Sequence, residues 1–158
     1  MNTPISNEIR NKIRQYSKNQ IDISPLIQNI NIRGEDLSRT IIKSFNRPDD
    51  DISGCNFYQT IIGEEGKITN LNRITAKNCN FHRAKFLGTV WVRNADFRDC
   101  NFREADLVAF DYKFANFQGC DCCDVIIRIG SDKGTGAKFD SNFLKDLAGS
   151  WGVEVKLK

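Results

Sequence analysis

The chain has 158 residues, of which 40% are apolar and 27% are charged, and its formal net charge is +3. This length supports one domain with a real core, and the composition is that of a folded chain rather than a disordered one. Residues 1–51 carry 8 basic and 7 acidic side chains, residues 52–129 carry 10 and 9, and residues 130–158 carry 5 and 4. No segment has a strong field of one sign, so a dedicated nucleic-acid-binding protein is disfavoured.

The sequence shows no membrane or export signal. Its uncharged apolar runs are far shorter than the ~18 residues that a membrane-spanning helix needs. The N-terminus, MNTPISNEIRNKIRQYS, has no apolar signal core. We therefore expect a cytoplasmic protein with no membrane partner.

Residues 1–31 are predicted to form a helical cap or arm. Ser6 or Thr3 is placed to cap the first helix. SPLIQNI predicts a short second helix with Ser24 as N-cap and Pro25 at the first helical position. The apolar residues that share one stripe of the first helix are Ile5, Ile9, Ile13 and Tyr16.

From residue 79 the sequence repeats with a period of five. It reads CNFHR, AKFLG and TVWVR, then one extra residue, Asn94, and then ADFRD, CNFRE, ADLVA, FDYKF, ANFQG, CDCCD and VIIRI. The third residue of each group is large and apolar, the first is usually small, and the second is often Asn or Asp. A period of five matches neither an α-helix nor a flat strand, and it suits a chain that turns a corner once per repeat.

These repeats resemble those of the pentapeptide-repeat family, whose signature is A(D/N)LXX with Phe common at the centre. The match is strong over 79–129, recognisable over 52–78 and weak over 32–51, where Arg47 stands at a centre position. The resemblance implies a mainly β fold, a right-handed quadrilateral β-helix of about four coils. In that fold the central residue and the small residue two before it point inward, and stacked coils lie ~4.8 Å apart.

Four repeats per coil should bring residues about 20 apart into one column. CNFYQ at 55–59 starts the column of the first face, and four extra residues near 63–67 and Asn94 account for the longer spacings. The predicted centres are Phe57, Phe81, Phe102 and Cys122 on the first face, Ile62, Phe86, Leu107 and Ile127 on the second, Leu71, Trp91 and Tyr112 on the third, and Ile52, Ala76, Phe97 and Phe117 on the fourth. The same register places four thiols in one internal column, those of Cys55, Cys79, Cys100 and Cys120.

The chain thus divides into a helical segment at 1–31, the coil at 32–129 and a C-terminal segment at 130–158. In the last segment DSNFLKDLAG predicts a short helix and WGVEVKLK an alternating strand. An open solenoid end exposes core and unpaired backbone, so both terminal segments are expected to cap the rod, with contact to a neighbouring molecule as the alternative.

No residue pattern indicates catalysis, a metal or a cofactor. In CDCC, Cys120 and Cys122 point inward and Cys123 outward, so these thiols cannot converge on one zinc ion. The glycines and lysines of 130–138 do not align with a phosphate-binding loop. His82 is predicted to be a solvated surface residue beside a charge ladder of Arg83, Arg103, Glu104 and Asp124.

Apolar residues occupy outward positions on two neighbouring faces, where a solvent-facing wall should be polar. Contiguous exposed apolar area usually marks an interface. Three candidates for covering this apolar area stay open: the terminal segments of the same chain, a second copy of the chain, and another protein. The predicted partner-binding residues are Ile61, Leu87, Val108, Ile126 and Ile129 on the second face, and Val90, Val92 and Phe114 on the third.

Two functions from different classes follow. The first is a non-enzymatic structural or protein-interaction module that docks a protein partner or forms a homo-oligomer, for example as an assembly or virion component inside a viral particle. The second comes from the family resemblance: some members mimic DNA and inhibit DNA gyrase. That mechanism needs a strongly negative surface, which the near-neutral coil lacks. An enzyme is not expected, and neither is direct binding of nucleic acid.

Overall fold

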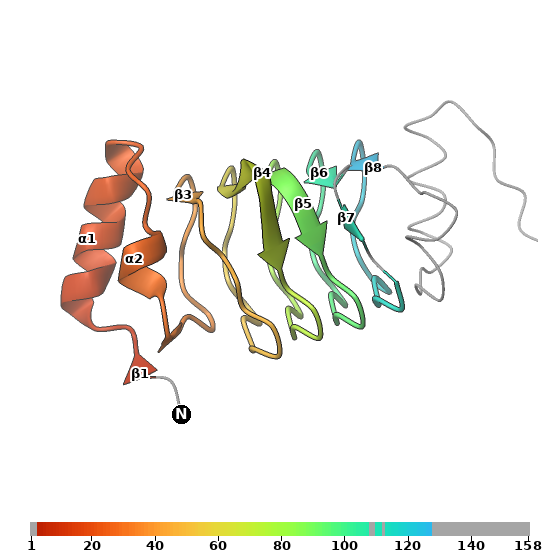
Figure 1. Cartoon of the computed structure of the whole chain (residues 1–158), viewed down its shortest axis with the longest axis horizontal. Helices are drawn as coiled ribbons and strands as arrows, with labels where there is room; N and C mark the ends of the chain where they lie inside the picture. Colours follow the sequence, from red (N-terminus) through yellow and green to blue (C-terminus); the bar gives the residue numbers. More distant parts are fainter. Residues whose placement is uncertain (1–2, 108–109, 112, 128–158) are drawn as a thin grey trace, which may run out of the picture.

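The computed structural model describes residues 3–107, 110–111 and 113–127. The chain forms a rod of stacked coils with two helices at its N-terminal end (Figure 1). The elements are β1 (Thr3–Pro4), α1 (Asn7–Lys18), α2 (Ser24–Ile27), β2 (Ile30–Asn31), β3 (Ile41–Ile42), β4 (Ile61–Asn70), β5 (Lys85–Trp91), β6 (Asp106–Leu107), β7 (Phe110–Asp111) and β8 (Ile126–Ile127).

Successive coils pair in parallel and in register, as the repeat predicts. One wall is a sheet in the order β3–β4–β5–β6–β8, with β7 paired to β5. Single bridges continue the pairing on the other walls, for example from Asn56 to Asn80, Asn101 and Asp121. Backbone hydrogen bonds join the coils, such as that from Phe81 N to the carbonyl oxygen of Asn101 at 2.7 Å. The predicted quadrilateral β-helix is confirmed over these residues.

The residue before each centre has a clear structural role at the corners. Asn80 Oδ1 accepts a hydrogen bond from the backbone N of His82 at 3.1 Å, and Asn101 Oδ1 accepts one from the backbone N of Arg103 at 3.0 Å. Asn and Asp form such turns readily because their short side chains reach the backbone two residues on. The last residue of the repeat then has positive φ, as in Arg83 at 56°. This turn ends one wall and starts the next.

Stacked phenylalanines and a file of thiols fill the interior. The Phe81 ring lies parallel to those of Phe57 and Phe102, with centroids 4.9 Å away on each side. The four predicted cysteines are all buried in one column, and each thiol donates to a backbone carbonyl of the preceding coil, as Cys100 Sγ does to Ala76 O at 2.8 Å. The predicted thiol column is therefore confirmed.

The third face has a different register from the predicted one. Lys85 pairs with Asp106, 21 residues on, whereas Val90 pairs with Phe110, 20 residues on, so the extra residue lies between Lys85 and Val90 and not at Asn94. Asn94 instead ends its repeat with φ 57°, a left-handed conformation that Asn tolerates well.

This shift exchanges core and surface in the sequence VWV. Val90 and Val92 are fully buried, and Trp91 is turned outward and half-buried. The prediction that Trp91 is a core centre and the two valines are surface residues is wrong. All three residues are apolar, so the apolar pattern fits either frame.

The N-terminal helices cover the first coil. Ser6 caps α1 as predicted, its side chain accepting from Ile9 N at 3.2 Å, and Ile5 and Ile13 are buried beneath the helix. The N-cap of α2 is Ile23 rather than Ser24, one residue earlier than predicted. Arg10 binds Glu35 of the coil with two hydrogen bonds, the longer at 2.9 Å, which ties α1 to the rod.

Arg47 fills a centre position that an apolar residue would normally occupy. It is buried, and its guanidinium donates to the carbonyl oxygens of Ile27 and Ile30 and to the Asp50 carboxylate. Arg47, which departs from the repeat pattern, therefore joins the first coil to the end of α2.

The helix and strand predicted within 130–158 lie outside the described residues. Among the helices that the structure describes, neither has the length and apolar character to cross a bilayer.

Candidate partner-binding surface

The structure places the predicted partner-binding residues in three different settings. Val90 and Val92 belong to the core and are removed from the surface. Ile61 and Leu87 are outward and half-buried, and Phe114 and Ile126 are 55% and 56% exposed. The remaining two, Val108 and Ile129, lie outside the described residues.

The apolar residues of the second face do not form one continuous strip. The outermost column of the sheet runs from Ile41 through Ile61, Lys85 and Asp106 to Ile126. A lysine and an aspartate therefore separate the apolar N-terminal pair from the isoleucine of the last described coil. Sequence spacing placed Ile61, Leu87 and Ile126 at outward positions, as the structure does, but it did not show which residues share a column.

Trp91 is a surface residue that the sequence prediction missed. It lies on the third face beside Asp111, to which it is paired. Arg93, two residues further along the same wall, donates to Asp111 Oδ2 from Nε at 2.8 Å and from Nη2 at 2.6 Å. The sequence did contain a signal for the correct register. Asn94 is better suited than Arg93 to the last position of a repeat, which has a left-handed backbone conformation.

Phe114 combines exposure with an unusual backbone conformation. Its φ is 57°, in a column whose other members, Asp49, Arg73 and Asn94, are polar. A bulky residue with positive φ is uncommon. Strained backbone conformations of this kind are concentrated at functional sites. Trp91 and Phe114 thus lie on one wall, one coil apart.

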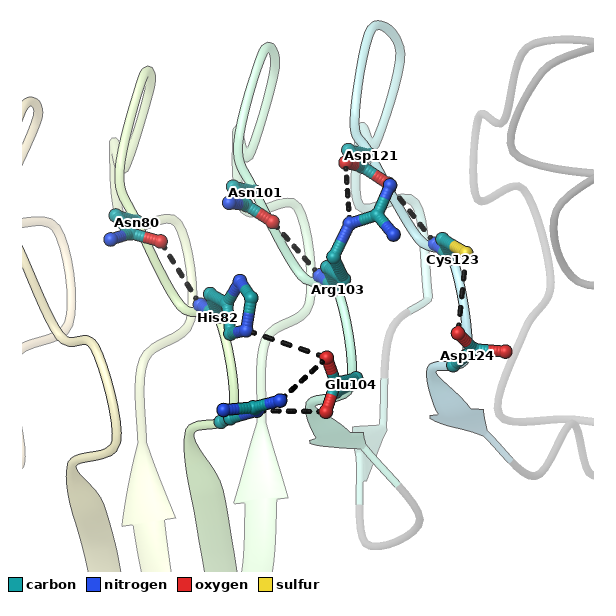
Figure 2. Close-up of polar contacts among 9 residues, drawn as sticks. Asn80, His82, Asn101, Arg103, Glu104, Asp121, Cys123 and Asp124 are labelled. Atoms are coloured by element: carbon teal, nitrogen blue, oxygen red, sulfur yellow. Dashed lines mark hydrogen bonds and ion pairs between the residues drawn. The ribbon is translucent and has the colours of Figure 1, made fainter.

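A polar cluster follows the corner between the first and second faces (Figure 2). Arg83 binds Glu104 through Nε at 2.7 Å and Nη2 at 3.2 Å, and this contact lowers the pKa of the Glu104 carboxyl. His82 Nε2 lies 3.5 Å from Glu104 Oε1, and the imidazole makes an edge contact with Tyr58 at 5.3 Å. The side chain of His82 is only 23% exposed, so the prediction of a solvated histidine is wrong.

The other half of the cluster contains the one cysteine predicted to face outward. Arg103 donates to Asp121 at 3.2 Å, and the Cys123 thiol donates to Asp124 at 3.3 Å (Figure 2). The hydrogen bond to Asp124 raises the pKa of the Cys123 thiol. A nucleophilic cysteine needs a lowered pKa, so this arrangement opposes thiolate chemistry.

Two of the interior thiols, those of Cys55 and Cys100, are held in their neutral form, whereas the hydrogen bond with Cys100 lowers the pKa of Cys79. Burial raises the pKa of Cys55 to about 12 and raises that of Cys100 well above its ordinary value. Within the described residues no group of three or more His, Cys, Asp or Glu side chains could hold a metal ion.

Comparison with known proteins gives matches among solved structures only. No protein-family model matches the chain, and neither does any curated protein. The pentapeptide repeat protein Rfr23 from the cyanobacterium Cyanothece 51142 is 18% identical, over 61% of this chain and 63% of that one, with a TM-score of 0.44. HetL from Nostoc sp. strain PCC 7120, described as involved in heterocyst differentiation regulation, is 14% identical over 66% and 57%, with a TM-score of 0.26.

QnrB1, described as a plasmid-mediated fluoroquinolone resistance protein, is 13% identical over 79% of this chain and 91% of that one, with a TM-score of 0.20. The match spans less than two thirds of the length of the first two proteins. This chain is a repeat module with a five-residue period and a four-sided coil, and in both features it resembles the pentapeptide-repeat proteins. This resemblance rests on the in-register pairing of the chain's own coils.

Proposed function

We propose that the protein is a non-enzymatic interaction module that docks a partner protein, or a second copy of itself, through its second and third faces. In this proposal residues 32–129 are the docking rod and the segments 1–31 and 130–158 flank it. An assembly or virion component is one setting in which such a rod would act, and a cytoplasmic location fits the same proposal.

The observation that supports this proposal is the placement of large apolar side chains on an otherwise polar wall. Trp91 and Leu87 are half-buried and Phe114 and Ile126 are more than half exposed. The strand partners of Trp91 are Asn70 and Asp111, and the partner of Ile126 is Asp106. Trp and Arg are the residues most enriched at the energetic centres of interfaces, and Arg93 lies two residues from Trp91. Stacked rings fill the described interior, so binding would take place on the outside of the rod.

Inhibition of DNA gyrase, the alternative, has no support in the charge of the coil. Residues 52–129 carry 10 basic and 9 acidic side chains, whereas a mimic of DNA must present a phosphate-like negative surface. We expect no protection of gyrase in a supercoiling assay at concentrations at which an acidic pentapeptide-repeat inhibitor acts.

The proposal is tested by comparing surface variants in the same capture and light-scattering experiments. Leu87→Glu and Trp91→Glu place charge on the proposed surface, and Gln118→Glu on the fourth face is the matched control because Gln118 is also exposed. We expect both test variants, but not the control, to lose a purified partner or to dissociate the oligomer. Equal association of all three variants would contradict the proposal.

A further inference from the structure

A polar depression lies between α1 and the first coil, at the N-terminal end of the rod. It consists of two hollows of about 350 and 510 Å³ that share the lining residues Ile13, Arg14 and Asp36 and therefore lie side by side, and we call the two together the groove. α1 lies across the N-terminal end of the rod (Figure 1).

Hydrogen bonds near both ends of α1 join the two walls of this groove and fix their relative position. Near the start of α1, Arg10 is hydrogen-bonded to Glu35 of the coil. Near its end, the hydroxyl of Ser17 donates to the carbonyl oxygens of Ser38 at 3.3 Å and Arg39 at 3.1 Å. The groove between these contacts is therefore part of the folded rod and does not depend on a ligand to form.

The groove carries three cations that have no acidic partner. Arg14 and Lys18 line it from α1 and Arg39 lines it from the coil. No carboxylate in the described part of the chain forms an ion pair with any of them. The one acidic side chain shared by both hollows, Asp36, is held within the coil by hydrogen bonds that its Oδ1 accepts from Ser38 N at 3.1 Å and from Asn56 Nδ2 at 2.9 Å. It keeps its negative charge, but the three cations outnumber it.

The coil positions its cation more firmly than an exposed arginine usually is. Arg39 occupies the left-handed last position of its repeat, with φ 57°, and its guanidinium lies 5.6 Å from the centre of the Tyr58 ring. Such a cation–π contact restricts the side chain. Tyr58 belongs to the next coil and lines neither hollow, and the guanidinium keeps N–H donors with which it can bind a carboxylate.

The spacing of the helix cations indicates the form of the ligand. Arg14 and Lys18 are four residues apart in α1, which is ~6.0 Å along the helix axis at 1.5 Å per residue. Alternate residues of an extended peptide are ~6.6 Å apart. A segment with acidic residues at alternate positions would therefore place one carboxylate beside each cation.

We propose that this groove binds an extended acidic segment of another protein, in which Asp or Glu occupies alternate positions. Arg14 and Lys18 bind successive acidic side chains, and Arg39 on the facing wall binds a further carboxylate. The intervening residues of the segment point out of the groove, where their identity matters little.

The test is a fluorescence-anisotropy titration of the full chain with labelled peptides. One peptide alternates Glu and Ser, a second has the same composition with the Glu residues in one block, and a third has Gln in place of Glu. We expect the alternating peptide to bind best, the Gln peptide not to bind, and the affinity to fall as salt is raised.

Variants assign the binding to the groove. Arg14→Glu combined with Arg39→Glu should weaken binding of the alternating peptide at least about tenfold, as reversal of paired charges does at interfaces. Lys67→Glu reverses the charge of a single exposed residue remote from α1 and should have no effect, whereas Arg14→Glu alone, which makes the same change in net charge, should weaken binding. Circular dichroism and the milder Arg14→Gln and Arg39→Gln variants separate lost binding from lost folding.

Three results would overturn the proposal: no binding of the alternating peptide at millimolar concentration, unchanged affinity in the double variant, or stronger binding of a single-stranded oligonucleotide at the same residues. Leu87→Glu and Trp91→Glu should leave the peptide affinity unchanged. Failure of this proposal is therefore distinguishable from failure of the docking surface on the second and third faces.

Discussion

At the scale of single residues, Arg47 shows how one exception to a repeat can have a structural purpose. A guanidinium at a core position is costly unless every donor finds an acceptor, and here two backbone carbonyls and the Asp50 carboxylate accept its hydrogen bonds. Arg47 therefore links the N-terminal helical segment to the first coil, a contact that an apolar residue at this position of the repeat would not make.

Replacement of Arg47 by leucine should destabilise the fold although leucine suits a core position. The substitution leaves the carbonyl oxygens of Ile27 and Ile30 and the Asp50 carboxylate without their donor, and we expect a loss of about 3 kcal/mol in the free energy of unfolding. Arg73→Leu is the control, because the pair of Arg73 with Asp49 is exposed. Urea unfolding of both variants measures the difference, and equal midpoints would contradict this role of Arg47.

The buried thiols predict a loss of stability in alkaline solution. The pKa of Cys55 is raised by burial from 9.0 to about 12, so between these pH values only the unfolded chain releases the proton. The free energy of unfolding should therefore fall as pH rises through this window, by up to ~1.4 kcal/mol per pH unit for this group.

The Cys55→Ala and Cys55→Ser variants isolate the contribution of this thiol. Neither replacement titrates in the window, and serine keeps a donor for Ile32 O, to which Cys55 Sγ donates at 2.8 Å. Both variants should show the same shallower decline in stability between pH 9 and 12. A decline as steep as that of the wild type would show that Cys55 does not retain its proton in the fold.

At the scale of elements, β4 and β5 show how the coil accommodates extra residues. The pairing of the two strands shifts register between Gly63 and Ile68, where β4 contains the additional residues. This segment passes so close to Gly88 that a Cβ there would lie 2.3 Å from Lys67 O and 2.4 Å from Glu64 O. Gly88 thus permits the close approach of the two backbones.

Gly88→Ala should be much more disruptive than Gly66→Ala. The two glycines have nearly the same φ, 73° and 72°, but a Cβ at Gly66 would meet no atom within 4 Å. We expect a loss of about 3 kcal/mol for Gly88→Ala from the overlap with backbone and the conformational strain, and about 1 kcal/mol for Gly66→Ala from the left-handed conformation alone. Thermal unfolding measures both, and equal losses would mean that the close approach costs nothing.

At the scale of the whole molecule, stability depends on contacts between neighbouring coils. Backbone hydrogen bonds join each coil to its neighbours, and the ring stack of Phe57, Phe81 and Phe102 continues through three coils. Loss of packing in a middle coil therefore weakens two interfaces at once, as expected for a solenoid.

Phe81→Ala should consequently be among the most damaging single substitutions in the rod. Phe81 is buried and its ring also contacts Phe86 and Phe97, so we expect a loss of about 4 kcal/mol in unfolding free energy. Phe114→Asn is the control, since Phe114 is exposed and Asn tolerates its positive φ. A similar loss for both variants, measured by urea unfolding, would argue against a core formed by the stack.

The sequence by itself determined the coil and most of its register. The inward columns of the first face, with Phe57, Phe81 and Phe102 at the centre and four cysteines beside them, follow from a five-residue period that only a regular turning chain satisfies. The cap at Ser6 could also be predicted, because a side-chain acceptor before an apolar helical stripe is a local signal.

Only the tertiary structure decided which residues of the third face are outside, what Arg47 binds and where the groove beside α1 lies. VWV satisfies the apolar pattern in two frames, and the extra residue between Lys85 and Val90 selects the one in which Trp91 faces outward. The backbone carbonyls that bind Arg47, and the unpaired cations on the two walls of the groove, come from segments about twenty residues apart in the chain. Periodicity specifies positions within a repeat, whereas contacts between a repeat and a helix outside it depend on how the two pack in space.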